Sequence, residues 1–150
     1  MLTPMAGIRV STEIDASRAE VWEVVRHVEH HVDWMHDAVA IRFTSPATSG
    51  AGTTFDCDTR IGPFRLTDRM EITRWAPEEA MGVRHVGVVT GTGQFTLDEL
   101  PGGRTRFSWQ ERLRFPWWMG GSVGAVVGGE VLKLVWGRNL RTLKGVVEAR

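Results

Sequence analysis

The 150-residue sequence contains no tyrosine, a single cysteine and no excess of either charge. The lone Cys57 excludes an internal disulfide and is the cysteine usage expected in a reducing compartment. The balance of 18 basic and 18 acidic residues does not favour binding to duplex DNA, which requires a basic surface. Residues Met1 to Val10 lack the apolar core of a secretory signal. We therefore expect a cytoplasmic protein without a nucleic-acid partner.

The sequence also lacks an apolar run of the roughly 20 residues that a membrane span needs. The nearest approach is Ser122 to Arg150, which predicts one long helix with an almost entirely apolar first half. Its second half narrows to a stripe with spacings of four, three and four residues: Trp136, Leu140, Leu143 and Val147. Because charges and glycines interrupt the run, we expect no integral membrane segment. A helix that is apolar on all sides is otherwise surrounded by protein, so we expect the preceding strands to wrap around it.

The chain before this helix predicts a sheet with two short helices. Ile8 to Ile14 alternates apolar and polar residues, as a half-buried strand does. Ser17 and Glu20 have capping-box spacing, which predicts a helix start near Arg18, and a short second helix is expected over His30 to Met35 after a break. Alternation with a period of two predicts further strands over 39–43, 53–61, 64–75, 81–86, 94–100 and 105–115. The short connections favour antiparallel pairing.

Several short motifs occur in a fixed order along most of the chain. They are Ser17-Arg-Ala-Glu20-Val-Trp22, Asp33-Trp34-Met35, Gly50-Ala-Gly52-Thr53, Pro101-Gly-Gly-Arg-Thr105 leading into Phe107-Ser-Trp109-Gln-Glu111, and Leu140-Arg-Thr-Leu143-Lys144. Their order resembles the START-like superfamily (SRPBCC, Bet v 1-like), of the polyketide cyclase/dehydrase and lipid-transport type. Members include lipid carriers, plant hormone receptors, polyketide aromatases and cyclases, and many bacterial proteins, so the fold does not fix the function.

The resemblance implies an α+β helix-grip fold over residues 1–150 as a single domain. In this fold a curved antiparallel sheet of about seven strands wraps around the long C-terminal helix, and two short helices follow the first strand. The resemblance also implies an apolar cavity between sheet and helix, and we expect no cofactor.

One strand departs from the aromatase and cyclase subgroup, in which a Trp-x-Ser-x-Arg arrangement is expected. The matching stretch here reads Leu66-Thr-Asp-Arg-Met70. Methionine replaces the inward arginine, and Arg69 falls on the solvent phase of the strand. A register shift of one residue would turn Arg69 instead of Asp68 toward the cavity. The strand register therefore bears directly on the aromatase interpretation.

Three polar residues, Asp68, His85 and Glu111, share a strand phase with apolar neighbours. A buried ionised carboxylate is costly unless it is paired, so these groups should border a wet cavity, pair with one another, or lie near a strand end in water. A histidine beside a carboxyl group of raised pKa could transfer protons on an enolisable ligand. The alternative is a structural role, or the orientation of a ligand's polar head, and no catalytic residue is assigned.

Two further patterns are interpreted as structural. His27 and His31 have the spacing of zinc ligands on a helix, but the predicted helix break lies between them and no third ligand is evident. We therefore expect no metal. Gly124 and Gly129 have P-loop spacing, but Glu130 stands where a P-loop requires lysine.

The loop Trp117-Trp118-Met119 lies between Pro116 and a pair of glycines. Three large apolar side chains in a loop predict a pocket lid, a membrane-touching tip, a dimer contact or a cap on the core at the mouth of the last helix. The sequence leaves these four interpretations open, and we take the pocket lid as the working assignment for Trp117, Trp118 and Met119, because Gly120 and Gly121 make the loop backbone easy to move.

The sequence thus predicts a protein that binds a hydrophobic small molecule, lipid or polyketide-like, between the sheet and the last helix. The residues expected to contact the ligand are Trp34, Phe55, Met70, His85, Phe95, Trp109, Glu111, Leu132, Trp136 and Asn139. One alternative is a cofactor-independent cyclase, aromatase or dehydratase that uses His85 and a carboxylate as acid and base. Another is a partner-binding module that uses the Trp117–Met119 loop. The protein is expected to be a monomer or a homodimer.

Overall fold

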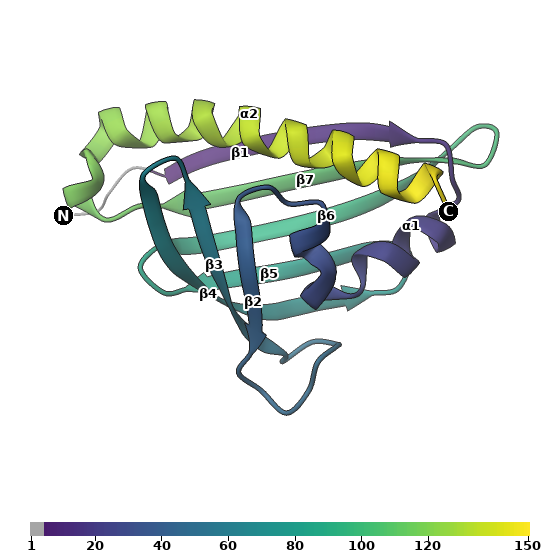
Figure 1. Cartoon of the computed structure of the whole chain (residues 1–150), viewed down its shortest axis with the longest axis horizontal. Helices are drawn as coiled ribbons and strands as arrows, with labels where there is room; N and C mark the ends of the chain where they lie inside the picture. The colour runs from purple at the N-terminus through teal and green to yellow at the C-terminus, as the bar shows by residue number, and fades with distance from the viewer. Residues whose placement is uncertain (1–4) are drawn as a thin grey trace.

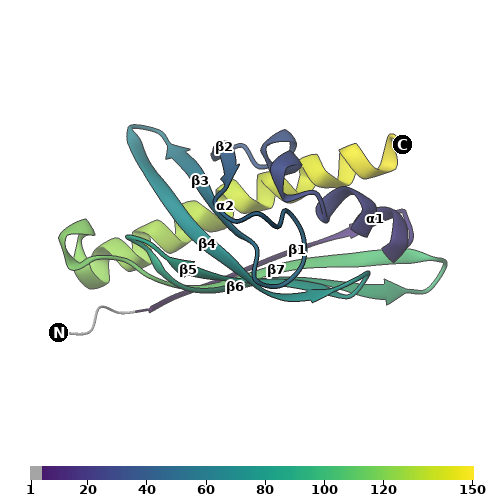
Figure 2. The same ribbon diagram turned by 90° about the horizontal axis from the view of Figure 1, so that it is seen from below.

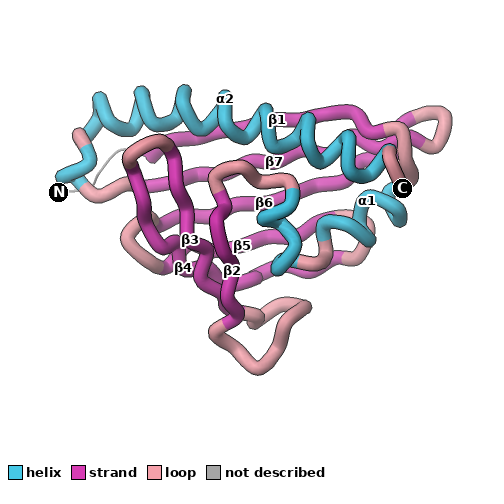
Figure 3. Tube along the Cα trace, in the orientation of Figure 1, coloured by secondary structure: helices cyan, strands magenta, loops and turns pink. Residues whose placement is uncertain are grey.

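The computed structural model describes residues 5–150, which form one curved antiparallel sheet with helices on its concave side (Figures 1 and 3). The elements in chain order are β1 (Met5–Ile14), α1 (Arg18–Val25), the 3-10 helix η1 (Val28–Asp33), β2 (Ala38–Phe43), β3 (Thr54–Ile61), β4 (Phe64–Ala76), β5 (Ala80–Val86), β6 (Thr90–Leu100), β7 (Arg104–Arg114), the 3-10 helix η2 (Trp117–Met119) and α2 (Gly121–Glu148). The strand order is β1-β7-β6-β5-β4-β3-β2. This is the predicted α+β helix-grip architecture.

The connection from β1 to the rest of the sheet follows the predicted capping chemistry. The Ser17 hydroxyl accepts the Glu20 backbone N–H at 3.2 Å, and the Glu20 carboxylate accepts the Ser17 N–H at 2.8 Å. Two backbone donors at the start of α1 are thereby satisfied. The predicted break after α1 is confirmed at His27. The second helix is the 3-10 helix η1, and it begins at Val28, two residues earlier than expected.

Tight turns join the strands from β3 onward. In the β3–β4 hairpin Ile61 pairs with Phe64, and Gly62 has a φ of 58°, a left-handed conformation that glycine adopts without a Cβ clash. Strand β6 begins at Thr90, four residues before the predicted start at Gln94. Its first residues alternate threonine and glycine, a composition typical of turns, so the apolar pattern did not reveal them.

The second half of α2 is gripped as predicted. The stripe Trp136, Leu140, Leu143 and Val147 is buried. Trp136 stacks on Trp109 of β7 with ring centroids 4.3 Å apart and planes inclined by 14°, which fixes this part of the helix against the sheet.

The first half of α2 is not wrapped, contrary to the prediction. Its outward face exposes Val126, Val127, Val131 and Leu134, and Leu134 is 76 % exposed. The main strand neighbour of α2 is the edge strand β1, and the first half extends along that edge while the β3–β4 hairpin rises away from it (Figure 2). A mostly apolar stretch of helix therefore lies at the rim of the sheet. Within residues 5–150, every helix falls short of the length and apolar character that a membrane span requires.

Candidate functional site

A hydrogen-bonded chain of three polar side chains crosses the concave face of the sheet. His85 of β5 stands at its centre, with Nδ1 at 2.8 and 3.0 Å from the two carboxylate oxygens of Asp68 on β4. Its Nε2 lies 2.8 Å from Oε1 of Glu111 on β7. The side chains of His85 and Glu111 are buried, and that of Asp68 is largely so. The structure thus brings together the three polar residues that the strand phases had grouped.

The strand phases explain why this cluster faces α2. Trp109 stacks on Trp136 of the helix and so marks the concave face of β7. Side chains two residues apart on a strand point to the same face, so Glu111 also faces the helix. Strands β5 and β7 are nevertheless not neighbours, because β6 lies between them. A carboxylate on β7 must therefore cross a whole strand to reach His85.

Gly93 of β6 makes this crossing possible. Gly93 is the cross-strand partner of Glu111, and a Cβ placed on it would overlap the Glu111 carboxylate and lie 2.7 Å from its Cγ. The missing side chain leaves the channel through which Glu111 lies across β6. Sequence reasoning missed Gly93 because a glycine in a strand has no polarity to signal a role. The signal available in the sequence was that Gly91 and Gly93 share one face of a strand. Glycine weakens a strand interior, so its presence there often marks a place where another group approaches the backbone closely.

The electrostatics of the cluster favour a charged histidine. Burial disfavours the imidazolium, but the hydrogen bonds and negative charges of Asp68 and Glu111 outweigh it and raise the pKa of His85 to about 10. Burial raises the pKa of Glu111 above its usual value against the lowering effect of His85, and the charges of Asp68 and Asp37 add to the rise. His85 therefore keeps its proton at neutral pH, and Glu111 is the group better suited to exchange one.

The register of β4 decides between Asp68 and Arg69. Asp68 pairs with Cys57 on the inner phase, and Arg69 pairs with Asp56, whose Oδ1 lies 3.1 Å from the Arg69 Nε. Arg69 is exposed on the outer face. Met70, two residues further along β4, shares the inner phase with Asp68. The register shift that would bring an arginine into the site does not occur.

Most of the aromatic residues predicted to line a cavity are packed against one another instead. Ring centroids lie 5.9 Å apart for Trp34 and Phe95, 5.4 Å for Phe95 and Trp109, and 4.3 Å for Trp109 and Trp136. All four side chains are buried, as is Phe55. They form solid core under the second half of α2.

Two predicted contact residues keep part of their surface free. Met70 on β4 and Leu132 on α2 are half-buried at the edge of this core. Met70 lies beside the polar cluster, since it is the cross-strand partner of His85. The apolar surface that remains available to a ligand is therefore near the first half of α2.

Asn139 was predicted to contact the ligand, but its side chain is hydrogen-bonded to the segment before β2. Its amide nitrogen donates to Asp37 Oδ1 at 2.7 Å, and its oxygen accepts the His36 backbone N–H at 2.8 Å. The Trp136 indole donates to the other Asp37 oxygen at 3.2 Å. Asn139 thus clasps α2 to the segment before β2. The sequence did not reveal the role of Asp37, because an aspartate between two predicted elements looks like an ordinary loop residue until its buried partners are known.

The remaining predicted residues do not join the cluster. Trp117 and Trp118 are 77 % and 64 % exposed in η2, and Met119 is half-buried. The interpretation of both tryptophans as a cap on the core is therefore wrong. His31 is buried, its Nε2–H donates to the Val25 carbonyl at 2.7 Å, and burial lowers its pKa to about 4. It is an uncharged core residue.

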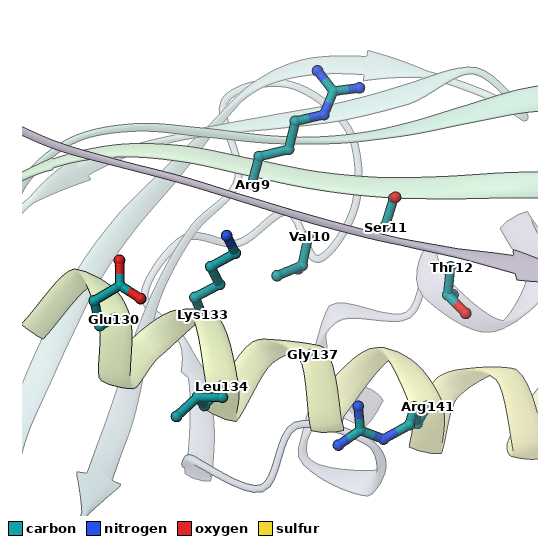
Figure 4. A pocket seen from close by; sticks show the side chains of 9 residues that line it. All are labelled: Arg9, Val10, Ser11, Thr12, Glu130, Lys133, Leu134, Gly137 and Arg141. Atoms are coloured by element: carbon teal, nitrogen blue, oxygen red, sulfur yellow. The ribbon is translucent and has the colours of Figure 1, made fainter.

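Two surface hollows lie away from the polar cluster. One, of about 520 Å³, runs between the edge strand β1 and α2, where Lys133 and Arg141 lie on the helix side and Ser11 and Thr12 on the strand side (Figure 4). The other, of about 280 Å³, lies over β4 to β7 and includes Gln94 and Gln110. Neither corresponds to the cavity predicted beneath the helix.

Comparison with known proteins supports the architecture along the whole chain. The profile of the family described as "Polyketide cyclase / dehydrase and lipid transport" matches residues 5–148. Among solved structures, TTHA0849 from Thermus thermophilus is 15 % identical with a TM-score of 0.78, and the alignment covers 95 % of this chain and 97 % of that one. A START superfamily protein from Mycobacterium smegmatis is 11 % identical with a TM-score of 0.78, and the corresponding shares are 95 % and 97 %.

A third similar structure is the Zhui aromatase/cyclase from Streptomyces sp. R1128. It is 18 % identical with a TM-score of 0.72, and the alignment covers 98 % of this chain and 96 % of that one. No curated protein sequence matches the chain. At these identities the structural likenesses establish the fold alone.

Proposed function

The chain belongs to the polyketide cyclase/dehydrase and lipid transport family, and on that premise we propose that it binds a hydrophobic small molecule, lipid or polyketide-like, on the concave face of the sheet beside the first half of α2. The observation that carries the proposal is the buried chain Asp68–His85–Glu111 facing the helix. A folded domain gains little stability from such a chain, because apolar residues of similar volume would often be at least as stable. A polar cluster in this position favours a role toward a ligand.

Apolar surface flanks the cluster on two elements. Leu66 and Met70 share the inner phase of β4 with Asp68, and Leu132 and Val135 of α2 are partly buried against the same hydrophobic core. All four side chains are half-buried, so a ligand that covers them removes apolar area from water, at about 25 cal/mol per Å². A mostly apolar surface with a few convergent polar groups is the usual composition of a small-molecule site.

Glu111 is the group that would meet the polar end of the ligand. Its Oε1 accepts from His85, and Oε2 has no hydrogen bond within the described part of the chain. An ionised Glu111 accepts a hydrogen bond from a ligand hydroxyl, and a protonated Glu111 donates one to a ligand carbonyl. His85 and Asp68 hold Glu111 in place and set its charge.

The second candidate function is a cyclase or dehydratase that acts on such a ligand. The raised pKa of Glu111 favours it, because a buried carboxyl group that holds its proton more tightly than an ordinary glutamate is better suited to act as general acid or base. In this scheme Glu111 removes a proton from carbon next to a ligand carbonyl, and the resulting neutral carboxyl returns a proton to the departing hydroxyl. His85, protonated throughout, stabilises the carboxylate form before and after the two steps.

Native mass spectrometry of the protein purified from its own host tests the binding proposal. We expect a retained small molecule in the wild type and its loss in Met70→Trp, which fills the surface beside His85. Val39→Trp on β2 is the matched control, because Val39 is exposed elsewhere. Retention by Met70→Trp at wild-type level would contradict the proposed site. Turnover of the identified molecule by the wild type and not by Glu111→Gln would favour the enzyme.

A further inference from the structure

Exposed large apolar side chains gather at one end of the molecule. This apolar end consists of Met5, Phe64, Val86, Val88, Trp117, Trp118, Val126 and Val127. It contains the turns at the left of Figures 1 and 2, and the outward face of α2 continues it through Val131 and Leu134. Large apolar side chains concentrated at one end of a soluble protein mark a candidate interaction surface.

Strand register confirms that these residues belong to one end. Met5 and Thr90 both pair with Arg114, the last residue of β7, and Thr90 pairs in turn with Val86. The chain then leaves β7 through Pro116 into η2, so Trp117 and Trp118 project beyond the sheet. The β3–β4 hairpin extends past the end of β5 and places Phe64 at the same end.

Four arginines lie at the apolar end, and the nearby turn of α2 carries Glu130 and Lys133, whose charges offset each other. On the β3–β4 hairpin Arg60 and Arg65 are direct cross-strand partners, an arrangement in which like charges repel. Arg112 and Arg114 lie at the end of β7. None of these four arginines forms an ion pair within residues 5–150, and the Nε of Arg114 is buried without a hydrogen-bond partner.

These charges distinguish between possible occupants of the surface. A second copy of the chain in a two-fold dimer would bring the same basic patch against itself, since an isologous interface uses identical surfaces. An anionic surface would instead neutralise the opposed Arg60 and Arg65. Exposed tryptophans at the tip of a short helical turn suit the interface of a lipid bilayer, where their apolar rings are covered and their N–H groups stay hydrated.

We propose that the apolar end, with its basic rim, docks on the surface of a bilayer that contains anionic phospholipid. Trp117 and Trp118 enter the interfacial layer, and Arg60, Arg65, Arg112 and Arg114 face the phosphate groups. This goes beyond the proposed function and does not depend on the identity of its ligand.

Co-sedimentation with vesicles of phosphatidylcholine and phosphatidylglycerol, mixed at about 3:1 to give an anionic surface, tests the proposal. We expect binding of the full chain that weakens strongly on pure phosphatidylcholine and at high salt. Arg60→Gln with Arg65→Gln should weaken it by about fivefold for each arginine. Arg104→Gln with Arg106→Gln, at the opposite end of the sheet, is the matched control and should leave vesicle binding near the wild-type value.

Trp117→Ser with Trp118→Ser should weaken vesicle binding by at least about tenfold and leave the melting temperature nearly unchanged, because both side chains are largely in water. If this variant fails to fold, the Arg60 and Arg65 variants still decide the matter. Equal binding to neutral and anionic vesicles, or equal loss in both arginine pairs, would overturn the proposal. So would a dimer in analytical ultracentrifugation that the tryptophan substitutions dissociate, together with no vesicle binding.

Discussion

Gly93→Ala is the substitution that most sharply tests how the polar cluster is built. The new methyl group would occupy the channel through which Glu111 crosses β6, with its Cβ 2.7 Å from Cγ and 2.8 Å from Cδ of Glu111. The φ of Gly93 is not positive, so the backbone itself accepts alanine. On those grounds alone the change should stabilise the chain by about 0.4–1 kcal/mol.

The displaced carboxylate reverses that expectation. Breaking a buried ion pair costs about 3–5 kcal/mol, because it leaves an uncompensated charge. We therefore expect Gly93→Ala to lower the free energy of unfolding by about 2–4 kcal/mol. Urea denaturation at pH 7 measures this difference directly.

A double-mutant cycle isolates the contact. In a Glu111→Ala background the methyl group meets no carboxylate, so Gly93→Ala should be neutral or stabilising there. Gly7→Ala on β1 is the matched control, since a Cβ at Gly7 meets no atom within 4 Å. A neutral Gly93→Ala in the wild type, or the same cost in both backgrounds, would refute the account of how Glu111 reaches His85.

The contacts of His85, Asn139 and Trp136 each have a measurable effect on stability. The free energy of unfolding should fall between about pH 6.5 and about 10, by up to about 1.4 kcal/mol per pH unit. The raised pKa of His85 gives stability that is complete below the pKa of the unfolded histidine and is lost as the pH rises through the pKa of the folded protein. Asp68→Asn should flatten this pH profile, measured by denaturation, and an unchanged profile would contradict the assignment. Asn139→Ala should lower the free energy of unfolding by about 1–3 kcal/mol, since it removes the hydrogen-bond partners of a buried Asp37 oxygen and of the His36 N–H. A smaller decrease than that of the control Arg138→Ala would contradict the role of Asn139 in holding α2. Trp136→Ala should cost about 3–5 kcal/mol as a fully packed aromatic, and a loss well under this range in thermal melts would mean that Trp136 lines an empty space.

Much of the fold was readable from local patterns. The capping pair Ser17 and Glu20 and the stripe from Trp136 to Val147 appear where the pattern placed them. Every predicted strand is present, although β1 and β6 begin three and four residues earlier than the alternation indicated. Strand phase also grouped Asp68, His85 and Glu111 on one face. Phase is a local property of each strand, and a correct strand order then brings residues of one phase together.

What failed depends on distances between elements. The apolar first half of α2 was expected to be wrapped, but periodicity does not tell how far a sheet extends, and Val127 and Leu134 lie beyond its rim. The pairing of Asn139 with Asp37 joins residues 102 positions apart, which no local pattern encodes. Gly93 acts through the absence of a side chain, and its role appears only when Glu111 is seen above it.

The proposed function rests on a charged His85 that is held between two carboxylates. Nitrogen-15 NMR of the histidine side chains reports this charge, with the buried His31 as an internal reference in the same spectra. His85 should keep both ring protons until the pH approaches about 10, while His31 should stay neutral down to about pH 4. The molecule retained by the protein should shift the His85 signals and leave those of His31 in place. A His85 pKa near the ordinary value of about 6.5, with no response to that molecule, would contradict the account.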